Sequence, residues 1–132
     1  MPDVLVPFLT PEWCDRVNQE AASLPEVEGA TGTLAVSIRR PTGVTGTYTA
    51  SFRDGKVTMV MGAAPDAPLR LELVEEDYAA LLVGELDLLG AYAMGRIRVT
   101  GDLEAGMRVL PLMDAEPYRD LNRRIHGLTA FV

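Results

Sequence analysis

The sequence predicts an α+β fold, a two-layer sandwich in which helices cover one face of a five-stranded, mostly antiparallel mixed sheet. Helix and strand patterns follow one another in the order helix, four strands, helices, strand, helix, helix. Asp54-Gly55 separates two runs of alternating polarity, which is typical of a two-residue antiparallel hairpin. In the register that this turn sets, the apolar side chains of both strands fall on one face. That face needs a cover, and the predicted helices supply it.

Length and composition limit the classes of protein to which the sequence can belong. A chain of 132 residues is long enough for one domain with its own core, and 48% apolar residues are typical of an ordered domain. Because Cys14 is the only cysteine, no internal disulfide can form. The net charge of −7 argues against binding to nucleic acid as the main task.

Hydropathy gives an expectation for location. No apolar run reaches the roughly 18–20 residues that a membrane-spanning helix needs. Residues 1–7 contain neither a basic region nor the apolar core of a signal peptide. We therefore expect a cytoplasmic protein without a transmembrane segment.

The first helix is predicted to begin at Thr10-Pro11-Glu12, after an apolar lead-in broken by prolines. These residues offer a capping hydroxyl, a proline where its missing N–H does no harm, and an acid in the first turn. Trp13 and Cys14 then lie on or beside an apolar stripe at helical spacing, and Pro25 ends the helix. We interpret both side chains as core residues.

Four strands are predicted next. Leu34, Val36 and Ile38 alternate with less apolar residues, which is the pattern of a half-buried strand. The Asp54-Gly55 turn then sets the register of the second and third strands. This register pairs Arg53 with Lys56, Phe52 with Val57, Ala50 with Met59, and Tyr48 with Met61. The fourth strand is predicted over Leu69 to Val74.

The stretch from Asp77 to Asp102 is predicted to form apolar helical turns and then the fifth strand. Acidic residues precede the helical part, as a helix N-terminus favours, and Gly84 and Gly90 interrupt it. Gly95 ends it, and a helical crossover of this kind allows the following strand to pair in parallel. The helical turns are apolar on more than one side, so we expect them to face other helices, a partner or an apolar ligand.

Two further helices are predicted after the fifth strand. The first starts at Asp102, is expected to extend to Met113, and would carry Leu103, Met107 and Leu110 on one side. The second has an apolar stripe formed by Tyr118, Leu121, Ile125 and Leu128. The chain then ends in Phe131 and Val132, which look exposed.

Several segments, taken in order, resemble the sterol carrier protein 2 (SCP2) domain family, in its bacterial stand-alone type. They are Gly84-Glu85-Leu86-Asp87, the run from Met94 to Asp102, and the leucine-rich helix from Leu103 to Met113. The upstream F-R-D-G-K-V hairpin and the L-x-L-x-L strand also match in order. The resemblance covers roughly residues 8–113, and it implies a single domain with a C-terminal helical tail over 114–132.

The resemblance also implies a fold and a function. It implies that the helices and the sheet enclose an apolar tunnel, and that the protein carries a fatty acid, a fatty acyl-CoA, a sterol-like molecule or another lipid without catalysis. Some family members serve as accessory domains joined to enzymes. The tail lacks a peroxisomal targeting tripeptide. We therefore expect lipid binding and lipid transport in the cytoplasm.

The candidate site combines the resemblance with a high methionine content, because methionine fills adaptable apolar space. The predicted tunnel lining consists of Met59, Met61, Leu82, Leu86, Leu89, Met94, Leu103, Met107 and Leu110. Arg96 and Arg98 are candidates for contacts with a lipid headgroup. The alternative is that the apolar residues only fill a core, and that the two arginines are ordinary solvated strand residues.

We expect no enzyme activity, cofactor or metal. The sequence contains none of the common hydrolase, zinc-protease, nucleotide-binding or redox motifs. His126 is the only histidine and fits a surface position near a helix end.

Two alternative functions remain open. One is a small α+β enzyme that uses Asp87 as a buried acid on an apolar substrate. The other is an interaction module that forms a homodimer, or binds a partner protein, through its helices or its C-terminal tail.

Overall fold

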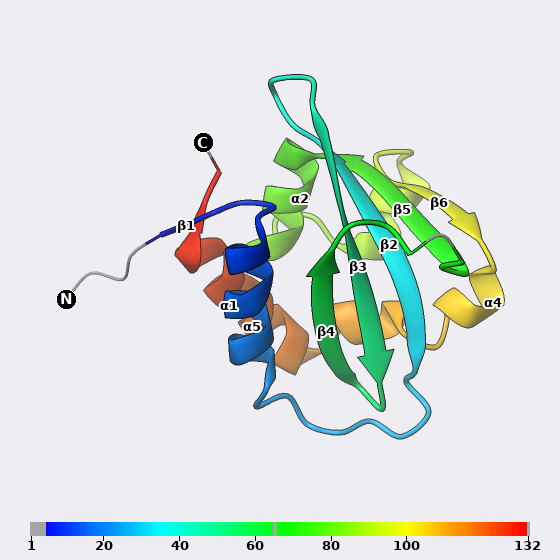
Figure 1. Ribbon diagram of the computed structural model, residues 1–132. Helices are drawn as coiled ribbons and strands as arrows, with labels where there is room; N and C mark the ends of the chain where they lie inside the picture. Colours follow the sequence, from blue (N-terminus) through cyan, green and yellow to red (C-terminus); the bar gives the residue numbers. More distant parts are fainter. Residues whose placement is uncertain (1–4, 65, 132) are drawn as a thin grey trace.

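A computed structural model describes residues 5–64 and 66–131 of the protein. A five-stranded sheet with the order β4-β3-β2-β5-β6 forms one layer (Figure 1). Its strands are β2 (Gly32–Arg39), β3 (Thr45–Arg53), β4 (Lys56–Met61), β5 (Leu69–Val74) and β6 (Arg98–Gly101). The α+β fold predicted from the sequence is confirmed.

The β3–β4 hairpin has the register that its turn predicts. Phe52 pairs with Val57 and Tyr48 pairs with Met61, in antiparallel orientation. Asp54 and Gly55 have φ values of 48° and 86°. Positive φ at both central positions is the type I′ requirement that makes Asp-Gly a strong hairpin signal.

The direction of the last strand differs from the sequence-based expectation. β6 pairs antiparallel with β5, and the parallel pair is β2 with β5. Parallel pairing of the strand after Gly95 was therefore wrong. The register places Arg98, where β6 starts, beside Glu72 near the end of β5. The intervening helices return the chain to the same end of the sheet, so β6 must run back along its neighbour.

The sheet face opposite the helices is partly covered by the connection between β4 and β5. Thr49 is buried on that face. Its hydroxyl donates a hydrogen bond to the carbonyl of Gly62 (2.7 Å) and accepts one from the amide of Ala64 (2.9 Å). This connection carries the chain across the sheet, from the β4 edge to the far side of β2.

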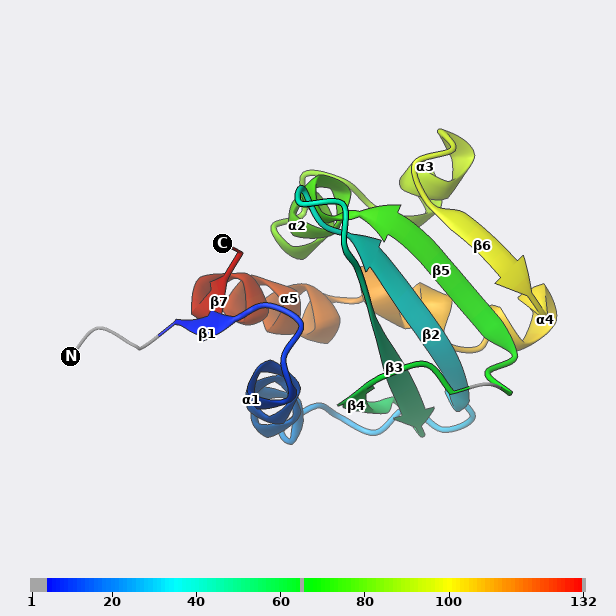
Figure 2. The same cartoon turned by 45° about the horizontal axis from the view of Figure 1, so that its top comes forward.

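Three helices lie on the same side of the sheet (Figure 2). They are α1 (Pro11–Ala21), α2 (Glu75–Leu82) and α5 (Glu116–Leu128). The Thr10 side chain caps α1 by accepting a hydrogen bond from the amide of Trp13 (3.1 Å). The Asn18 side chain then joins α1 to β4, since it donates to the Met59 carbonyl (2.9 Å) and accepts from the Met59 amide (2.7 Å). The predicted apolar stripe of α5 is buried.

The segments between these elements are short. They are α3 (Leu88–Ala93), α4 (Leu103–Gly106) and the 3-10 helix η1 (Leu110–Asp114). The single long helix expected from Asp102 to Met113 was wrong, and so was its apolar side. Leu103 and Met107 are exposed, whereas Val109 and Leu110 are buried. α4 ends at Gly106, where an added Cβ would lie 2.9 Å from the Leu69 side chain, so the backbone approaches the core closely there.

The two ends of the described chain lie side by side. β1 (Val6–Pro7) pairs in parallel with β7 (Thr129–Ala130), forming a second small sheet. Phe131 is half-buried, and its ring centroid lies 4.9 Å from that of Phe8. The expectation of an exposed Phe131 was therefore wrong, and Val132 lies outside the described residues.

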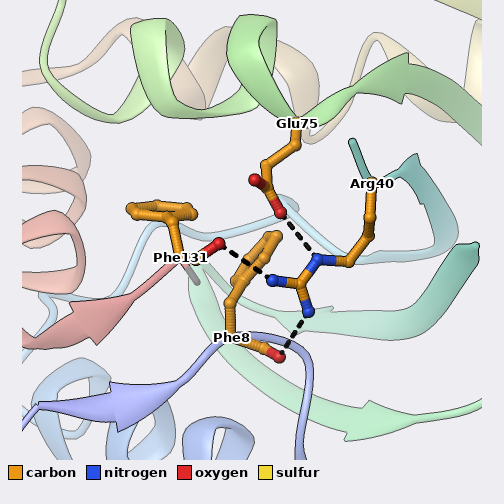
Figure 3. A network of polar contacts seen from close by, with 4 residues as sticks. All are labelled: Phe8, Arg40, Glu75 and Phe131. Atoms are coloured by element: carbon orange, nitrogen blue, oxygen red, sulfur yellow. Dashed lines mark hydrogen bonds and ion pairs between the residues drawn. The ribbon is translucent and has the colours of Figure 1, made fainter. Parts of the chain in front are cut away.

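Arg40 fastens both chain ends to the rest of the fold (Figure 3). Its Nε donates to the Glu75 carboxylate at 2.7 Å. The guanidinium also donates to the carbonyls of Phe8 (3.3 Å) and Phe131 (3.1 Å). The Arg40 and Glu75 side chains are 23% and 10% exposed, so most of this charge pair is removed from water. We call Arg40, Glu75 and the two carbonyls the Arg40 clamp.

Candidate ligand cavity

A cavity of about 90 Å³ lies between the sheet and the helices. Residues of four strands, β2 to β5, form one wall, because they share a face of the sheet. The strand residues are Leu34, Val36, Tyr48, Ala50, Met59, Leu71 and Leu73. The opposite wall consists of Tyr78, Leu81, Leu82, Leu86, Leu88, Ile97, Met113, Asp114 and Asn122. We call this space the inner cavity.

The inner cavity is small for a ligand site. Pockets for small molecules usually enclose about 300–1,000 Å³, and an engineered cavity of about 150 Å³ holds benzene. A volume of about 90 Å³ has room for only a few methylene-sized groups. A complete lipid can therefore enter only if part of the wall moves.

A second, more polar space of about 480 Å³ adjoins the inner cavity. The two share Leu81, Leu82, Leu86, Met113, Asp114 and Asn122. The second space is also lined by the loop from Val83 to Asp87, by Met94, and by two basic residues of α5, Arg119 and Arg123. We call it the outer cleft. The shared residues mean that only a few side chains separate the apolar interior from the surface.

The structure brings together some of the predicted lining residues. Met59, Leu82 and Leu86 line the inner cavity, and Met94 lines the outer cleft. Met61 is half-buried and Leu110 is buried, but neither lines either space. The remaining three are exposed and line neither space: Leu89 (56%), Leu103 (50%) and Met107 (58%).

The two arginines considered for a headgroup also lie away from the cavity. Arg96 pairs with Asp77 at 3.7 Å, and Arg98 pairs with Glu72 at 3.9 Å. Both side chains are more than half exposed, and neither lines the inner cavity or the outer cleft. This placement fits the alternative in which both are solvated residues, but only Arg98 belongs to β6, and Arg96 lies just before it.

Sequence reasoning missed a pair of tyrosines in the cavity wall. The hydroxyls of Tyr48 on β3 and Tyr78 on α2 are hydrogen-bonded at 3.0 Å, and both residues are buried. Burial raises the pKa of both phenols well above the ordinary value, so both stay protonated at neutral pH. The available signal was general: a buried tyrosine needs a partner for its hydroxyl.

The other side chains that could take part in chemistry, Cys14, Asp87 and His126, are engaged in burial, helix capping or ring contacts. Burial, and to a lesser degree the Asp15 carboxylate, raise the pKa of the Cys14 thiol to about 11. Asp87 caps α3 by accepting a hydrogen bond from the Gly90 amide (2.7 Å). The ring of His126 lies 5.6 Å from that of Phe131.

Within residues 5–64 and 66–131 there is no group of three or more side chains suited to holding a metal ion. No helix in the same ranges is long and apolar enough to span a membrane.

Solved structures with a similar fold include several sterol carrier proteins. The apo form of sterol carrier protein 2 from Yarrowia lipolytica has a TM-score of 0.63 at 14% identity, over 83% of this chain and 100% of that one. Palmitated SCP2L2 from Aedes aegypti has a TM-score of 0.64 at 13% identity, over 82% and 96% of the two chains.

An enzyme also shares the fold over part of its length. The sec-alkylsulfatase Pisa1 from Pseudomonas sp. has a TM-score of 0.51 at 22% identity, over 76% of this chain but only 15% of that one. At such identities the likeness shows the fold alone.

Sequence comparison identifies the family. No curated protein matches the sequence. The family model of the SCP-2 sterol transfer family matches residues 12–114, which include the five-stranded sheet and all but one of the residues that line the inner cavity. The match covers well over half of the protein, and the chain belongs to the SCP-2 sterol transfer family.

Proposed function

We propose that the protein binds and carries a lipid, such as a fatty acid, a fatty acyl-CoA or a sterol-like molecule, and does so without catalysis. One observation carries the proposal: an apolar inner cavity whose wall comes from both layers of a fold that belongs to a lipid-transfer family. The palmitated Aedes aegypti structure supports an acyl chain as the guest. An apolar wall discriminates weakly among chains, because each buried methylene contributes only about 0.8 kcal/mol.

The proposed entrance lies at the loop between α2 and α3. Leu82 and Leu86 line both the inner cavity and the outer cleft, so their displacement would join the two spaces. Gly84 lies between them with a φ of 79°, and an added Cβ there would meet open space. Outward movement of this loop would give a lipid chain the room that the inner cavity lacks.

An accessory role in a larger enzyme assembly is a second candidate. It is favoured by the sec-alkylsulfatase, of which this fold covers only 15%. In this alternative the exposed side chains of α3, namely Leu89 and Tyr92, would contact the partner enzyme. The alternative requires a protein partner, whereas carriage of a lipid does not.

Catalysis by Asp87 has little support. Its carboxylate is exposed and already caps α3. The phenols in the cavity wall stay protonated at neutral pH and therefore do not act as bases there. No observation on the polar groups of the cavity favours a reaction over binding.

Native mass spectrometry of the purified protein tests the proposal most directly. We expect a species heavier than the polypeptide by the mass of a lipid, which extraction with organic solvent removes. The extracted protein should then bind a fluorescent fatty acid. If the purified protein carries no lipid and the extracted protein takes up none, the proposal is wrong.

A cavity-filling variant locates the binding site. Ala50 is buried in the cavity wall, and Ala50→Leu places three more carbon atoms there. We expect an affinity for the fluorescent fatty acid about five- to 150-fold lower, since overpacking costs about 1–3 kcal/mol. Ala93→Leu makes the same change at an exposed position outside both spaces and should bind normally. Equal affinity in both folded variants would place the lipid elsewhere.

A further inference from the structure

The inner cavity contains a polar feature that an apolar guest would not use. Tyr48 and Tyr78 both line it, and they are only 4% and 7% exposed. Two phenylalanines would fill almost the same volume without removing two hydroxyl groups from water, a removal that costs free energy. The pair therefore needs an explanation beyond packing.

The two tyrosine hydroxyls can donate one more hydrogen bond than they form within the described residues. Each hydroxyl has one proton to donate and can also accept. The only hydrogen bond of these two groups within residues 5–64 and 66–131 is the one that joins them, and it uses one proton. Whichever tyrosine donates, the other keeps an O–H proton without an acceptor among the described residues. An incoming oxygen atom can accept that proton.

The charges of the wall define which oxygen fits. Among the described residues, no Lys, Arg or His lines the inner cavity, and the one ionisable carboxylate in its wall is Asp114. A ligand carboxylate would lose its hydration there without gaining a cation, and Asp114 would repel it. The basic residues Arg119 and Arg123 line only the outer cleft. The interior thus suits an uncharged oxygen.

We propose that the Tyr48–Tyr78 pair donates a hydrogen bond to an uncharged hydroxyl or carbonyl oxygen of the ligand. The ligand class is a long-chain alcohol, ketone or ester. Neither tyrosine lines the outer cleft, so the oxygen lies at the closed side of the cavity and the chain extends toward the loop from Val83 to Asp87. This inference rests on the proposed lipid-binding function and adds the polarity and the orientation of the guest.

Three probes of equal chain length test the inference at pH 7.4: decane, 1-decanol and sodium decanoate, each displacing a fluorescent fatty acid. We expect 1-decanol to bind most tightly to the unmodified protein. In the double variant Tyr48→Phe/Tyr78→Phe, which removes both hydroxyls and leaves neither unpaired, its affinity should fall about three- to tenfold, as the loss of one hydrogen bond predicts. The affinity for decane should not fall.

Tyr118→Phe is the matched control. Tyr118 is also buried, but its hydroxyl donates to the Gly55 carbonyl (2.6 Å) and it does not line the inner cavity. This variant should keep the preference for 1-decanol even if its stability falls.

The remaining outcomes contradict the inference or the function on which it rests. Tighter binding of decanoate or decane than of 1-decanol to the unmodified protein overturns the inference, and this ranking needs no variant to fold. An unchanged affinity of the folded double variant for 1-decanol overturns it as well. If the fluorescent fatty acid binds but 1-decanol does not displace it, the inference is overturned and lipid binding stands; if the fluorescent fatty acid itself does not bind, the lipid-binding proposal fails.

Discussion

The closed side of the molecule and its entrance side differ in how their apolar residues are used. On the closed side, Phe8 and Trp13 are at most 2% exposed, and their rings meet edge to face with centroids 5.0 Å apart. On the entrance side, α3 and the residue after it present Leu89, Tyr92 and Met94 with about half of each side chain exposed. The first region is a tightly packed, buried core, whereas the second keeps apolar surface in contact with water.

This difference separates stability from binding. The closed side is tied by the Arg40 clamp and by a hydrogen bond from the Trp13 indole to the Thr129 hydroxyl (2.8 Å). On the entrance side, Gly84 and Gly95 flank α3, and both have positive φ. The inner cavity borders both regions. One wall can therefore stay fixed while the other yields to a guest.

The largest expected effect is on the closed side. Trp13→Ala removes a fully buried ring and its hydrogen bond, and should lower the free energy of unfolding by about 3–5 kcal/mol. Urea denaturation measures it. Tyr92→Ala, the matched change on the entrance side, should cost no more than about 0.5 kcal/mol. Similar losses in both variants would abolish the distinction between the two regions.

The rate at which a thiol is alkylated is expected to differ between the same two regions. Because burial raises the pKa of Cys14 from 9.0 to about 11, the thiolate fraction at pH 8 is about 100-fold lower than in an unfolded chain. Iodoacetamide should therefore react at least that much more slowly with the folded protein than with the urea-unfolded protein. The raised pKa also favours the folded state below pH 9, and this contribution is lost as the pH rises toward 11.

A cysteine on the entrance side supplies the contrast. Leu89→Cys in a Cys14→Ala background places a thiol where the native side chain is 56% exposed. It should react with iodoacetamide at nearly the rate of the unfolded protein. Rapid reaction of Cys14 in the folded protein would show that the closed side opens readily.

The Arg40 clamp gives a smaller effect. Arg40→Ala leaves the Glu75 carboxylate without its cation and two carbonyls without their donor, and should cost about 1–3 kcal/mol of unfolding free energy. Arg40→Lys keeps the charge but cannot reach all three acceptors, so its loss should be intermediate. Denaturation curves identical to those of the unmodified protein would mean that the clamp adds no stability.

The smallest effect is expected for the two ion pairs whose arginines are more than half exposed, Arg96–Asp77 and Arg98–Glu72. Arg96→Ala and Arg98→Ala should each change stability by less than about 1 kcal/mol, since both arginine side chains lie mostly in water and their contacts are long, 3.7 and 3.9 Å. Fluorescent fatty-acid titration should show unchanged affinity in both variants. A loss of tenfold or more in either variant would support the headgroup role considered from the sequence.

Local chemistry explains which parts of the fold could be predicted. The Asp54-Gly55 turn fixes a register by itself, because few residue pairs accept positive φ at both positions. The start of α1 follows in the same way from the Thr10 cap and Pro11. Both predictions depend on neighbours within a few residues of the chain.

The features that could not be predicted depend on distant partners. β1 and β7 have two residues each and lie more than a hundred residues apart, so neither shows a periodic pattern. In α3 and α4, with fewer than two turns each, apolar residues do not reveal which side meets the sheet. Leu89, Leu103 and Met107 were therefore placed on the lining because they lie in segments expected to cover the sheet, without knowledge of which side faces it. The Tyr48–Tyr78 contact exists only once α2 lies over β3.

The bond between Asn18 and Met59 has a consequence for how the molecule behaves among its own copies. An edge strand with unpaired backbone groups is a template for strands of other chains, and such templates promote aggregation. β4 is an edge strand, but the Asn18 amide already occupies the outward-facing groups at its centre. The opposite edge, β6, offers only four residues. Sheet extension from one copy to the next is thus disfavoured at both borders.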